Sequence, residues 1–552
     1  MHETARAVAL AVAAGLALAD ASIVTLALPD ILRDLDTTIE GVAAVIGLYT
    51  LVIAVALLPL ERLASRSSVR AVGAGGFALL ALASGACALA NSLPVLLVAR
   101  GAQALGGAAG LATAFELLGG ARGRGRGLWV WTAVFATAVG PAIGGALTQA
   151  FSWRAIFVFQ VPIGAAGVAA VLAGPGRAPG AVTVPEPSED APRFAWRPAA
   201  ALGLVSASLS AVLFLLVLLL VAGWNVSPLG AAGAVTIIPV AALAGARIGG
   251  SGQTRAVAGC GLVGGGVLAL AWLPTVSLWW TVVPQLLAGV GMGLALTALG
   301  GQLLPERTPR DAARLLTLRY AGIAAILTIA APIAAHELDA ATLTAREQGV
   351  ALVLDASLPP LDKVKLAPAL LKGVQSDQPR IGLRRAIAAQ RGRFQGSDLV
   401  TYDKLGQRAD DTLVTAVGKA FRSSFVIAGA AGFLGALLLF AGVRLAALAT
   451  AGALAIGVPL AYAGLHRAIA PKPPAILDPC SAHRAAPSAG GLGGLLQRQA
   501  LALLDQTACR LGSSREELVL ALADEADAKR FQREHGVNPR TLGGVLQTLL
   551  GG

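Results

Sequence analysis

Apolar runs long enough to cross a lipid bilayer occupy most of this chain. A helix needs about 20 apolar residues to span the hydrocarbon core, and the sequence contains thirteen windows of that kind. They lie near 6–28, 41–60, 71–90, 94–117, 128–150, 155–173, 199–222, 228–248, 256–274, 278–300, 316–335, 423–443 and 445–465. Only 13% of the residues are charged and 56% are hydrophobic, a balance that no soluble globular fold has. We therefore predict an all-α polytopic membrane protein.

Basic residues lie on alternate connections between these spans. Arginines follow the second, fourth, eighth and tenth spans, whereas the connections 91–94 and 223–227 contain neither Lys nor Arg. Because short cytoplasmic loops carry the excess of basic residues, we expect the N-terminus in the cytoplasm. The net charge of +12 then reflects membrane topology and gives no reason to expect a nucleic-acid partner. No small-residue cleavage site follows the first span, so we expect that span to be retained.

A polar, Pro-rich break separates six spans from the next six. Many transporters consist of two such halves, with the substrate site near the middle of the membrane between them. We expect an N-terminal six-helix half at 1–173, a cytoplasmic linker at 174–198, the first five helices of the C-terminal half at 199–335, its last helix at 422–443, and an extra transmembrane helix at 444–465.

Two segments are too polar to lie in the membrane, and a count of thirteen spans places both on the extracytoplasmic side. The loop at 336–421 is expected to be helical over 361–374, 380–394 and 402–420. The tail at 466–552 opens with a Pro-rich stalk. Its run Ser513-Ser-Arg-Glu-Glu517 then predicts a capped helix that extends to about Ala526, within a small helical domain.

Four cysteines divide between the spans and the tail. Cys87 and Cys260 fall within predicted spans, whereas Cys480 and Cys509 lie in the tail, where exported thiols pair readily. We predict a Cys480–Cys509 disulfide; the alternative is two free thiols in a cytoplasmic tail. No metal site is expected, because His483 is the nearest additional ligand and the spacing is not that of a zinc site.

The first and fourth spans each contain an ionisable residue well inside the apolar run. Asp20 lies roughly 12 Å and Arg100 roughly 9 Å from the outer end, at about 1.5 Å per helical residue. An unpaired charge at this depth costs several kcal/mol, so we expect both side chains to face each other, the interior or water. The two residues form either a proton-coupling site, in which Arg100 controls a titratable carboxylate, or a fixed structural ion pair.

Four more polar residues of the spans have two interpretations each. Glu116 ends the fourth span and is either a second proton site or an interfacial charge that reaches water. Arg319, early in the eleventh span, presents the same choice. Gln103 and Gln285 either line a substrate cavity or form hydrogen bonds between helices.

The fifth span contains Gly140-Pro141-Ala-Ile-Gly144-Gly145 in an otherwise apolar run. Proline frees a backbone carbonyl that lipid cannot hydrogen-bond, so other protein groups must lie close by. Gly140, Gly144 and Gly145 permit such a close approach, as small residues do at other helix–helix contacts in membranes. We expect a tightly packed helix at this position.

These motifs resemble those of the drug:proton antiporter branch of the major facilitator superfamily. The run DASIVTLALP from Asp20 is similar to the first-helix motif, and RGAQALG from Arg100 is similar to the fourth-helix motif. The run GPAIGG from Gly140 resembles the fifth-helix motif associated with antiport. The resemblance implies the major facilitator fold and a multidrug efflux-type exporter.

The sequence departs from this branch in two places. The loop at 61–70 reads ERLASRSSVR, so two glycines and the acidic residue that helps latch the cytoplasmic gate in the family are missing. The linker at 174–198 has no room for the two additional spans that many members carry between the halves.

The residues and the resemblance together predict a multi-pass transporter in a bacterial cytoplasmic membrane. It would export an amphipathic small molecule (a drug, lipid or metabolite) in exchange for protons, by alternating access. The expected proton-coupling residues are Asp20, Arg100 and Glu116, and the expected cavity residues are Gln103, Gln285 and Arg319. The alternative is a non-transporting membrane scaffold whose loop and tail bind a cell-envelope partner, which the altered 61–70 loop favours. We expect neither enzymatic activity nor a cofactor, because no nucleophile–base pairing or metal cluster is evident.

Overall fold

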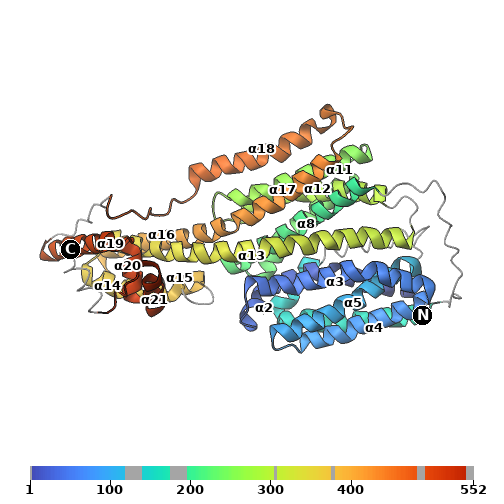
Figure 1. The fold of residues 1–552 in the computed structure, drawn as a ribbon, viewed down its shortest axis with the longest axis horizontal. Coiled ribbons are helices and arrows are strands. Elements are labelled where there is room, and N and C mark those ends of the chain that lie inside the picture. The colour runs from blue at the N-terminus through green and yellow to red at the C-terminus, as the bar shows by residue number, and fades with distance from the viewer. Residues whose placement is uncertain are drawn as a thin grey trace. The chain divides into compact units, whose positions relative to one another are not determined.

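The computed structural model describes residues 3–118, 140–174, 195–303, 308–374, 379–481 and 491–541 (Figure 1). Helices are the regular secondary structure throughout these ranges, and no strand occurs in them. The chain folds as two compact units. The membrane unit comprises 1–222, 226–336 and 421–469, and the loop–tail unit comprises 223–225, 337–420 and 470–552.

The N-terminal half of the membrane unit consists of helices that pack through small residues. Its helices are α1 (Glu3–Thr25), the short α2 (Leu28–Asp34), α3 (Ile39–Arg66), α4 (Val69–Ala88), α5 (Leu93–Leu117), helical residues 140–150, and α7 (Trp153–Leu172). Thr38 and Ser68 cap α3 and α4, because each side chain accepts a backbone N–H of the first turn. A Cβ on Gly106 would lie 2.5 Å from the backbone nitrogen of Leu80, so α4 and α5 pack with their backbones almost in contact.

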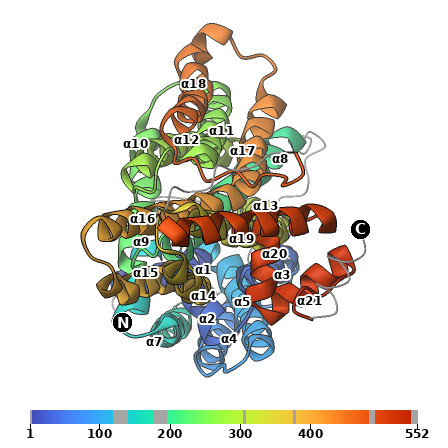
Figure 2. The ribbon, with the colours of Figure 1, turned by 90° about the vertical axis from the view of Figure 1, so that its left-hand side faces the viewer.

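The C-terminal half has the same kind of packing. Its helices are α8 (Trp196–Leu218), which continues as a π-helical turn (Leu219–Gly223), α9 (Pro228–Val235), α10 (Ile237–Arg247), α11 (Gly252–Ala269), α12 (Trp279–Leu303), the first part of α13 (Pro309–Asp355), and α17 (Arg422–Leu439). Gly259 and Gly291 bring α11 and α12 together, since a Cβ on either residue would meet the other helix's backbone within 2.7 Å. Figure 2 shows α10, α11 and α12 as one group and α4, α5 and α7 as another.

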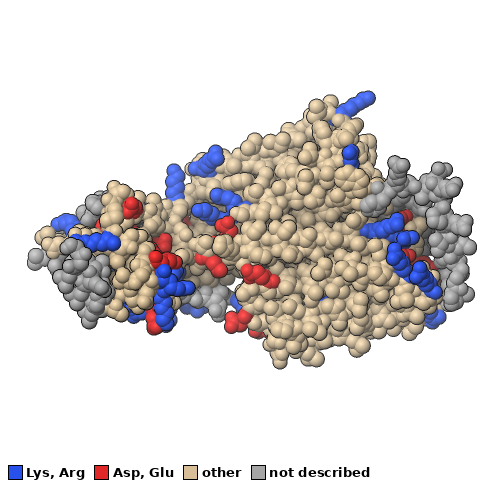
Figure 3. Space-filling view, viewed as in Figure 1, with Lys and Arg blue, Asp and Glu red and all other residues tan. Residues whose placement is uncertain are grey.

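Twelve described helices are long and apolar enough to cross a membrane. The remaining expected span, the fifth in the chain at 128–150, is described only from Gly140 onward. The extra helix α18 (Leu445–Ile469) packs on α11, where a Cβ on Gly265 would lie 2.3 Å from the Ala455 carbonyl oxygen. In Figure 3 the visible sides of the membrane unit carry few charged residues, as expected of a lipid-facing surface.

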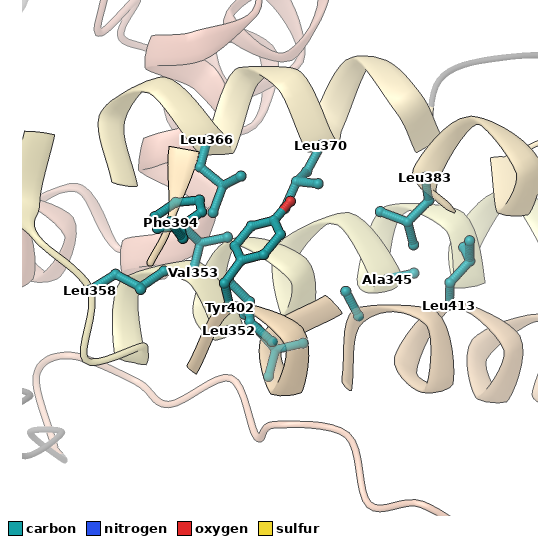
Figure 4. Close-up of a cluster of buried hydrophobic side chains, with 12 residues drawn as sticks. Ala345, Leu352, Val353, Leu358, Leu366, Leu370, Leu383, Phe394, Tyr402 and Leu413 are labelled. Atoms are coloured by element: carbon teal, nitrogen blue, oxygen red, sulfur yellow. The ribbon is translucent and has the colours of Figure 1, made fainter. Parts of the chain in front are cut away.

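The loop–tail unit has a hydrophobic core of its own. It combines the remainder of α13 with α14 (Pro360–Val374), α15 (Pro379–Gln390), a 3-10 turn (Arg391–Arg393), α16 (Gly396–Ala420), α19 (Gly491–Leu511), α20 (Arg515–Ala523) and α21 (Glu525–His535). In Figure 4 Leu366 and Leu370 point toward the Tyr402 ring from above, and Leu358 and Leu383 lie on either side of it in the same core. The loop and the tail, which we treated as separate segments, therefore share one folded unit.

Three expected helix boundaries were wrong. The eleventh span does not end its helix near 335, because α13 continues to Asp355; a change from apolar to polar residues marks a membrane edge and does not stop a helix. The helix expected over 402–420 begins already at Gly396. The tail helix expected to reach Ala526 ends at Ala523, because Asp524 adopts an extended backbone and caps the next helix, α21.

Candidate proton-coupling site

The two charges of the first and fourth spans meet inside the N-terminal half. Nη1 of Arg100 lies 2.6 Å from Oδ2 of Asp20, and the side chains are 0% and 1% exposed. This contact is an ion pair without hydrogen-bond alignment, since Asp20 Oδ2 and Arg100 Nη2 have no hydrogen-bond partner in the described chain. Nε of Arg100 donates to the Val45 carbonyl of α3 at 3.2 Å.

Three uncharged side chains extend this pair into a closed network. Gln160 on α7 donates its amide Nε2 to Oδ1 of Asp20 at 2.8 Å. Gln103 accepts from Nη1 of Arg100 at 2.6 Å and donates to the Ser84 hydroxyl of α4 at 2.8 Å. The same Gln103 amide also donates to Oε1 of Gln160, which closes the ring, and the Ser84 hydroxyl oxygen lies 3.2 Å from that oxygen. We call these five buried residues the Asp20 network.

Sequence reasoning identified Asp20, Arg100 and Gln103 but missed the other two members. Gln160 is the one hydrogen-bonding side chain between residues 155 and 173, so its isolation in an apolar span was a usable signal. Ser84 gave a weaker signal, because serine is common in membrane helices and often bonds its own backbone. Ser84 does so here as well, to the Leu80 carbonyl at 2.6 Å.

Two aromatic rings lie against the Arg100 guanidinium. Its central carbon is 4.2 Å from the ring centre of Tyr49 and 5.7 Å from that of Phe157. The Tyr49 hydroxyl donates to the Ala17 carbonyl of α1 at 3.0 Å. Cation–π contacts are strongest away from water, so these rings partly replace the hydration that Arg100 has lost.

The other predicted residues lie apart from this network. Glu116 is half-buried and sixteen residues beyond Arg100 on α5, or roughly 24 Å along the helix. Arg122, which follows it six residues later in the sequence, falls outside the described residues. Gln285 is buried on α12 and donates to Thr281 of the same helix at 2.9 Å, with its carbonyl oxygen unbonded within the described chain. Arg319 is partly exposed on α13.

The glycine-rich helix 140–150 contacts both halves of the membrane unit. A Cβ on Gly144 would lie 2.2 Å from the Ile23 carbonyl oxygen of α1, and a Cβ on Gly140 would meet Ser22 at the same distance. A Cβ on Gly145 would lie 2.5 Å from Ala232 of α9 in the C-terminal half. Pro141 is buried beside them. Gly144 and Gly145 are therefore positions where only hydrogen fits without movement of a neighbouring helix, whereas a Cβ on Gly140 would displace the Ser22 hydroxyl.

The acidic connection after the first span is tied to the start of α7. Nη1 of Arg154 lies 2.6 Å from Oδ2 of Asp34, and the indole Nε1 of Trp153 donates to the same oxygen at 3.0 Å. The hydrogen bonds from Arg154 and Trp153 hold the pKa of the Asp34 carboxyl below its usual value.

The loop–tail unit contains the predicted cysteine pair. Cys480 and Cys509 are joined by a disulfide, with their Cα atoms 5.0 Å apart. Its loop and tail also meet through ion pairs from Arg515 to Asp355, at 3.1 Å, and from Arg346 to Asp527. His483 lies outside the described residues. Glu517, Glu534 and His535 come close enough together to share a cation, and Nε2 of His535 lies within hydrogen-bond distance of Oε1 of Glu517, at 3.1 Å.

Two six-helix halves with a buried carboxylate–guanidinium pair define a secondary transporter of the major facilitator type. The family model of the Major Facilitator Superfamily matches residues 10–334, and the chain belongs to that family. The all-α fold class, the multi-pass location in a bacterial cytoplasmic membrane and the assignment to a family of transporters, which are not enzymes, are thereby confirmed.

Curated relatives with drug-resistance names match part of the chain. Identity is 39% over 152 residues with the multidrug resistance protein Stp of Mycobacterium tuberculosis, covering 26% of this chain and 28% of that protein. It is 36% over 167 residues with the methylenomycin A resistance protein of Streptomyces coelicolor, covering 29% and 35%. For the tetracenomycin C resistance and export protein of Streptomyces glaucescens it is 35% over 172 residues, covering 30% and 31%. The matched part spans about a third of each relative's length.

A solved structure shares the fold. The inward-facing, occupied form of a bacterial homologue of the human lysosomal transporter Spinster aligns with a TM-score of 0.56 at 16% identity. The alignment covers 79% of this chain and 95% of that one. At this identity the likeness concerns the fold alone.

Proposed function

We propose that this protein is a proton-coupled antiporter that exports amphipathic small molecules by alternating access. The observation that carries the proposal is the buried ion pair of Asp20 and Arg100, which is surrounded by the side chains of Ser84, Gln103 and Gln160. The resistance and export names of the partial relatives support the choice of drug-like molecules as substrates.

Protonation of Asp20 would neutralise one member of the buried ion pair. Removing one charge from a buried ion pair destabilises its surroundings by about 3–5 kcal/mol, because the other charge stays buried and uncompensated. Arg100 would then keep only Val45 and Gln103 as described hydrogen-bond acceptors, and its free Nη2 would seek another. The movement of Arg100 toward a new acceptor is the step that couples the proton to the conformation of α5.

The direction of transport follows from the membrane potential. An interior-negative potential favours inward movement of one positive charge by about 2.3 kcal/mol per 100 mV. Asp20 binds a proton from the outside and releases it inside, and substrate affinity changes reciprocally with proton affinity. One proton per cycle is therefore enough to sustain a substrate concentration ratio of tens-fold.

The helix 140–150 packs against both halves of the membrane unit, and we call this contact the packed seam. Gly144 packs on α1 and Gly145 packs on α9, so one rigid helix touches both moving parts without intervening side chains. Gln149 on the same helix accepts from the backbone N–H of Leu229 at 3.0 Å. Such close backbone packing leaves little space for ions or water to pass between the halves.

The membrane-scaffold alternative receives no support from the comparisons, although the altered loop at 61–70 favoured it. Transport and scaffolding are separated by one experiment. Purified protein in proteoliposomes is given a pH gradient and a panel of amphipathic cations, anions and lipids. We expect uphill movement of at least one class that stops when the gradient is dissipated. Absence of gradient-driven movement across the whole panel, in protein shown to be folded, would overturn the antiporter proposal.

A further inference from the structure

We propose that Tyr320, from the C-terminal half, is a positioning residue that reports closure of the two halves to the proton site of the N-terminal half. It acts through the backbone carbonyl of Ala17. The inference rests on the proposed antiport function and specifies how the moving halves and Asp20 are coupled.

The Ala17 carbonyl receives two tyrosine hydroxyls, one from each half. Tyr49 of α3 donates at 3.0 Å, and Tyr320 of α13 donates at 3.4 Å. Both tyrosines are fully buried, with 0% and 2% of their surface exposed. Ala17 lies on α1 three residues before Asp20, so its carbonyl and the Asp20 side chain share one helical turn.

The placement of Tyr320 is set by backbone packing within the C-terminal half. A Cβ on Gly322 would lie 2.0 Å from the Gly203 carbonyl oxygen, so α13 lies directly against α8 at this level. The tyrosine two residues earlier therefore moves with α8 and α13 as one body. Its hydroxyl reaches α1 only while that part of the C-terminal half lies against the N-terminal half.

Tyr49 connects this carbonyl to the ion pair. Its hydroxyl bonds Ala17, and its ring lies 4.2 Å beneath the Arg100 guanidinium. The Tyr320 bond is the longer of the two, so it is the weaker one and breaks first when the halves separate. Its loss removes a constraint from the α1 turn that holds Asp20 and from the ring that supports Arg100.

Among the described residues, the charged or titratable side chains close to Asp20 are Arg100 from α5, Cys87 from α4, Tyr49 from α3 and Tyr320 from α13, while α7 contributes the neutral Gln160. The described state has the Tyr320 bond and the Asp20–Arg100 pair together. Because the two contacts occur together, weakening the Tyr320 hydrogen bond should favour loss of the Asp20–Arg100 pair. Removal of the Tyr320 hydroxyl should therefore make it easier for protonation of Asp20 to separate the two halves.

The test uses the full chain in nanodiscs, with spin labels at Ser67 and Gly249, which are exposed positions in the two halves. The distance distribution is measured from pH 5 to pH 9. Tyr320→Phe keeps the ring and removes only the hydroxyl, and we expect the pH midpoint of the distance change to rise by up to about half a unit, the effect of a hydrogen bond at the weak end of the usual range. Thr328→Val is the matched control, since it removes a hydroxyl of the same helix that donates to the Ala324 carbonyl of α13 and not to α1. It should leave the midpoint unchanged.

Two results would overturn the inference, and the Asp20→Asn variant tells them apart. If the wild type responds to pH, Asp20→Asn does not, and Tyr320→Phe has the wild-type midpoint or shifts equally with Thr328→Val, only the role of Tyr320 fails. If the wild type shows no response, or Asp20→Asn keeps it, the proton site fails together with this inference.

Discussion

Nη1 of Arg100 lies 2.6 Å from Oδ2 of Asp20, between two membrane helices and out of contact with solvent. Charges this deep are retained only where they are paired or used. The surrounding side chains of Ser84, Gln103 and Gln160 offer Arg100 and Asp20 other polar partners when the pair opens. We therefore propose that the Asp20 network is a site of protonation change.

The seam role of the helix 140–150 predicts opposite outcomes for two neighbouring substitutions. Gly144→Leu must displace α1, because even a Cβ would lie 2.2 Å from the Ile23 carbonyl oxygen. Overpacking of this kind costs about 1–3 kcal/mol, and we expect export to fall by roughly tenfold or a proton leak to appear. The measurement is substrate export and pH-gradient decay in proteoliposomes.

Ala146→Leu is the control for that experiment. Ala146 lies two residues further along the same helix and is exposed, so a leucine there faces lipid or open surface and should leave export close to the wild-type rate. Wild-type export by the Gly144→Leu variant would mean that close packing of Gly144 on α1 is not needed for transport.

The predicted topology places the loop–tail unit outside the cell. A cysteine at Ser397, which is exposed on α16, should react with a membrane-impermeant maleimide in intact cells. A cysteine at Ser67, exposed between α3 and α4, should react only after the cells are opened. The two native cysteines of the membrane unit, Cys87 and Cys260, are buried and add little background. The reverse labelling pattern would place the loop–tail unit in the cytoplasm and contradict the predicted cytoplasmic N-terminus.

Lys363 should make the stability of the loop–tail unit depend on pH. Burial lowers the pKa of this lysine from 10.5 to about 8, and its ammonium group donates to the Leu354 carbonyl at 2.8 Å. Between pH 8 and about 10.4 the unfolded segment keeps a proton that the folded unit has lost, so the free energy of unfolding should rise with pH. The free energy of unfolding should rise by about 2–3 kcal/mol over this range, and Lys363 should cause no change in it with pH below pH 8.

Urea-dependent proteolysis of the full chain at pH 7 and pH 10 measures this effect. Lys363→Met keeps the length of the side chain without its charge and should show no such rise, so the difference between variant and wild type cancels the protease's own pH dependence. Equal pH dependence in both proteins would mean that the lysine is solvated in the folded unit.

Much of the fold and half of the Asp20 network could be predicted from the sequence, because both depend on composition and local spacing. Apolar runs gave the spans, and the rarity of charge within them singled out Asp20 and Arg100. Gln160 was accessible by the same argument and was overlooked. Glycines at 140, 144 and 145 indicated close packing, which the structure places against α1 and α9.

Other relationships depend on tertiary arrangement and leave no local pattern. The hydroxyl of Tyr320 reaches the Ala17 carbonyl across 303 residues of sequence, and nothing near either residue specifies the other. The ion pair of Arg346 with Asp527 joins loop to tail across 181 residues for the same reason. The end of a helix at the membrane edge could not be predicted either, because α13 remains helical after its apolar residues stop.

The most direct test of the account is uphill transport by Asp20→Asn. Asparagine keeps the size and one hydrogen-bond acceptor for Gln160 but cannot take up or release a proton. In proteoliposomes with an imposed pH gradient, we expect the folded variant to lose substrate accumulation while retaining downhill exchange of substrate for substrate. If the Asn variant still concentrates substrate against its gradient, Asp20 is structural and the proton carrier lies elsewhere, with Glu116 the next residue to replace.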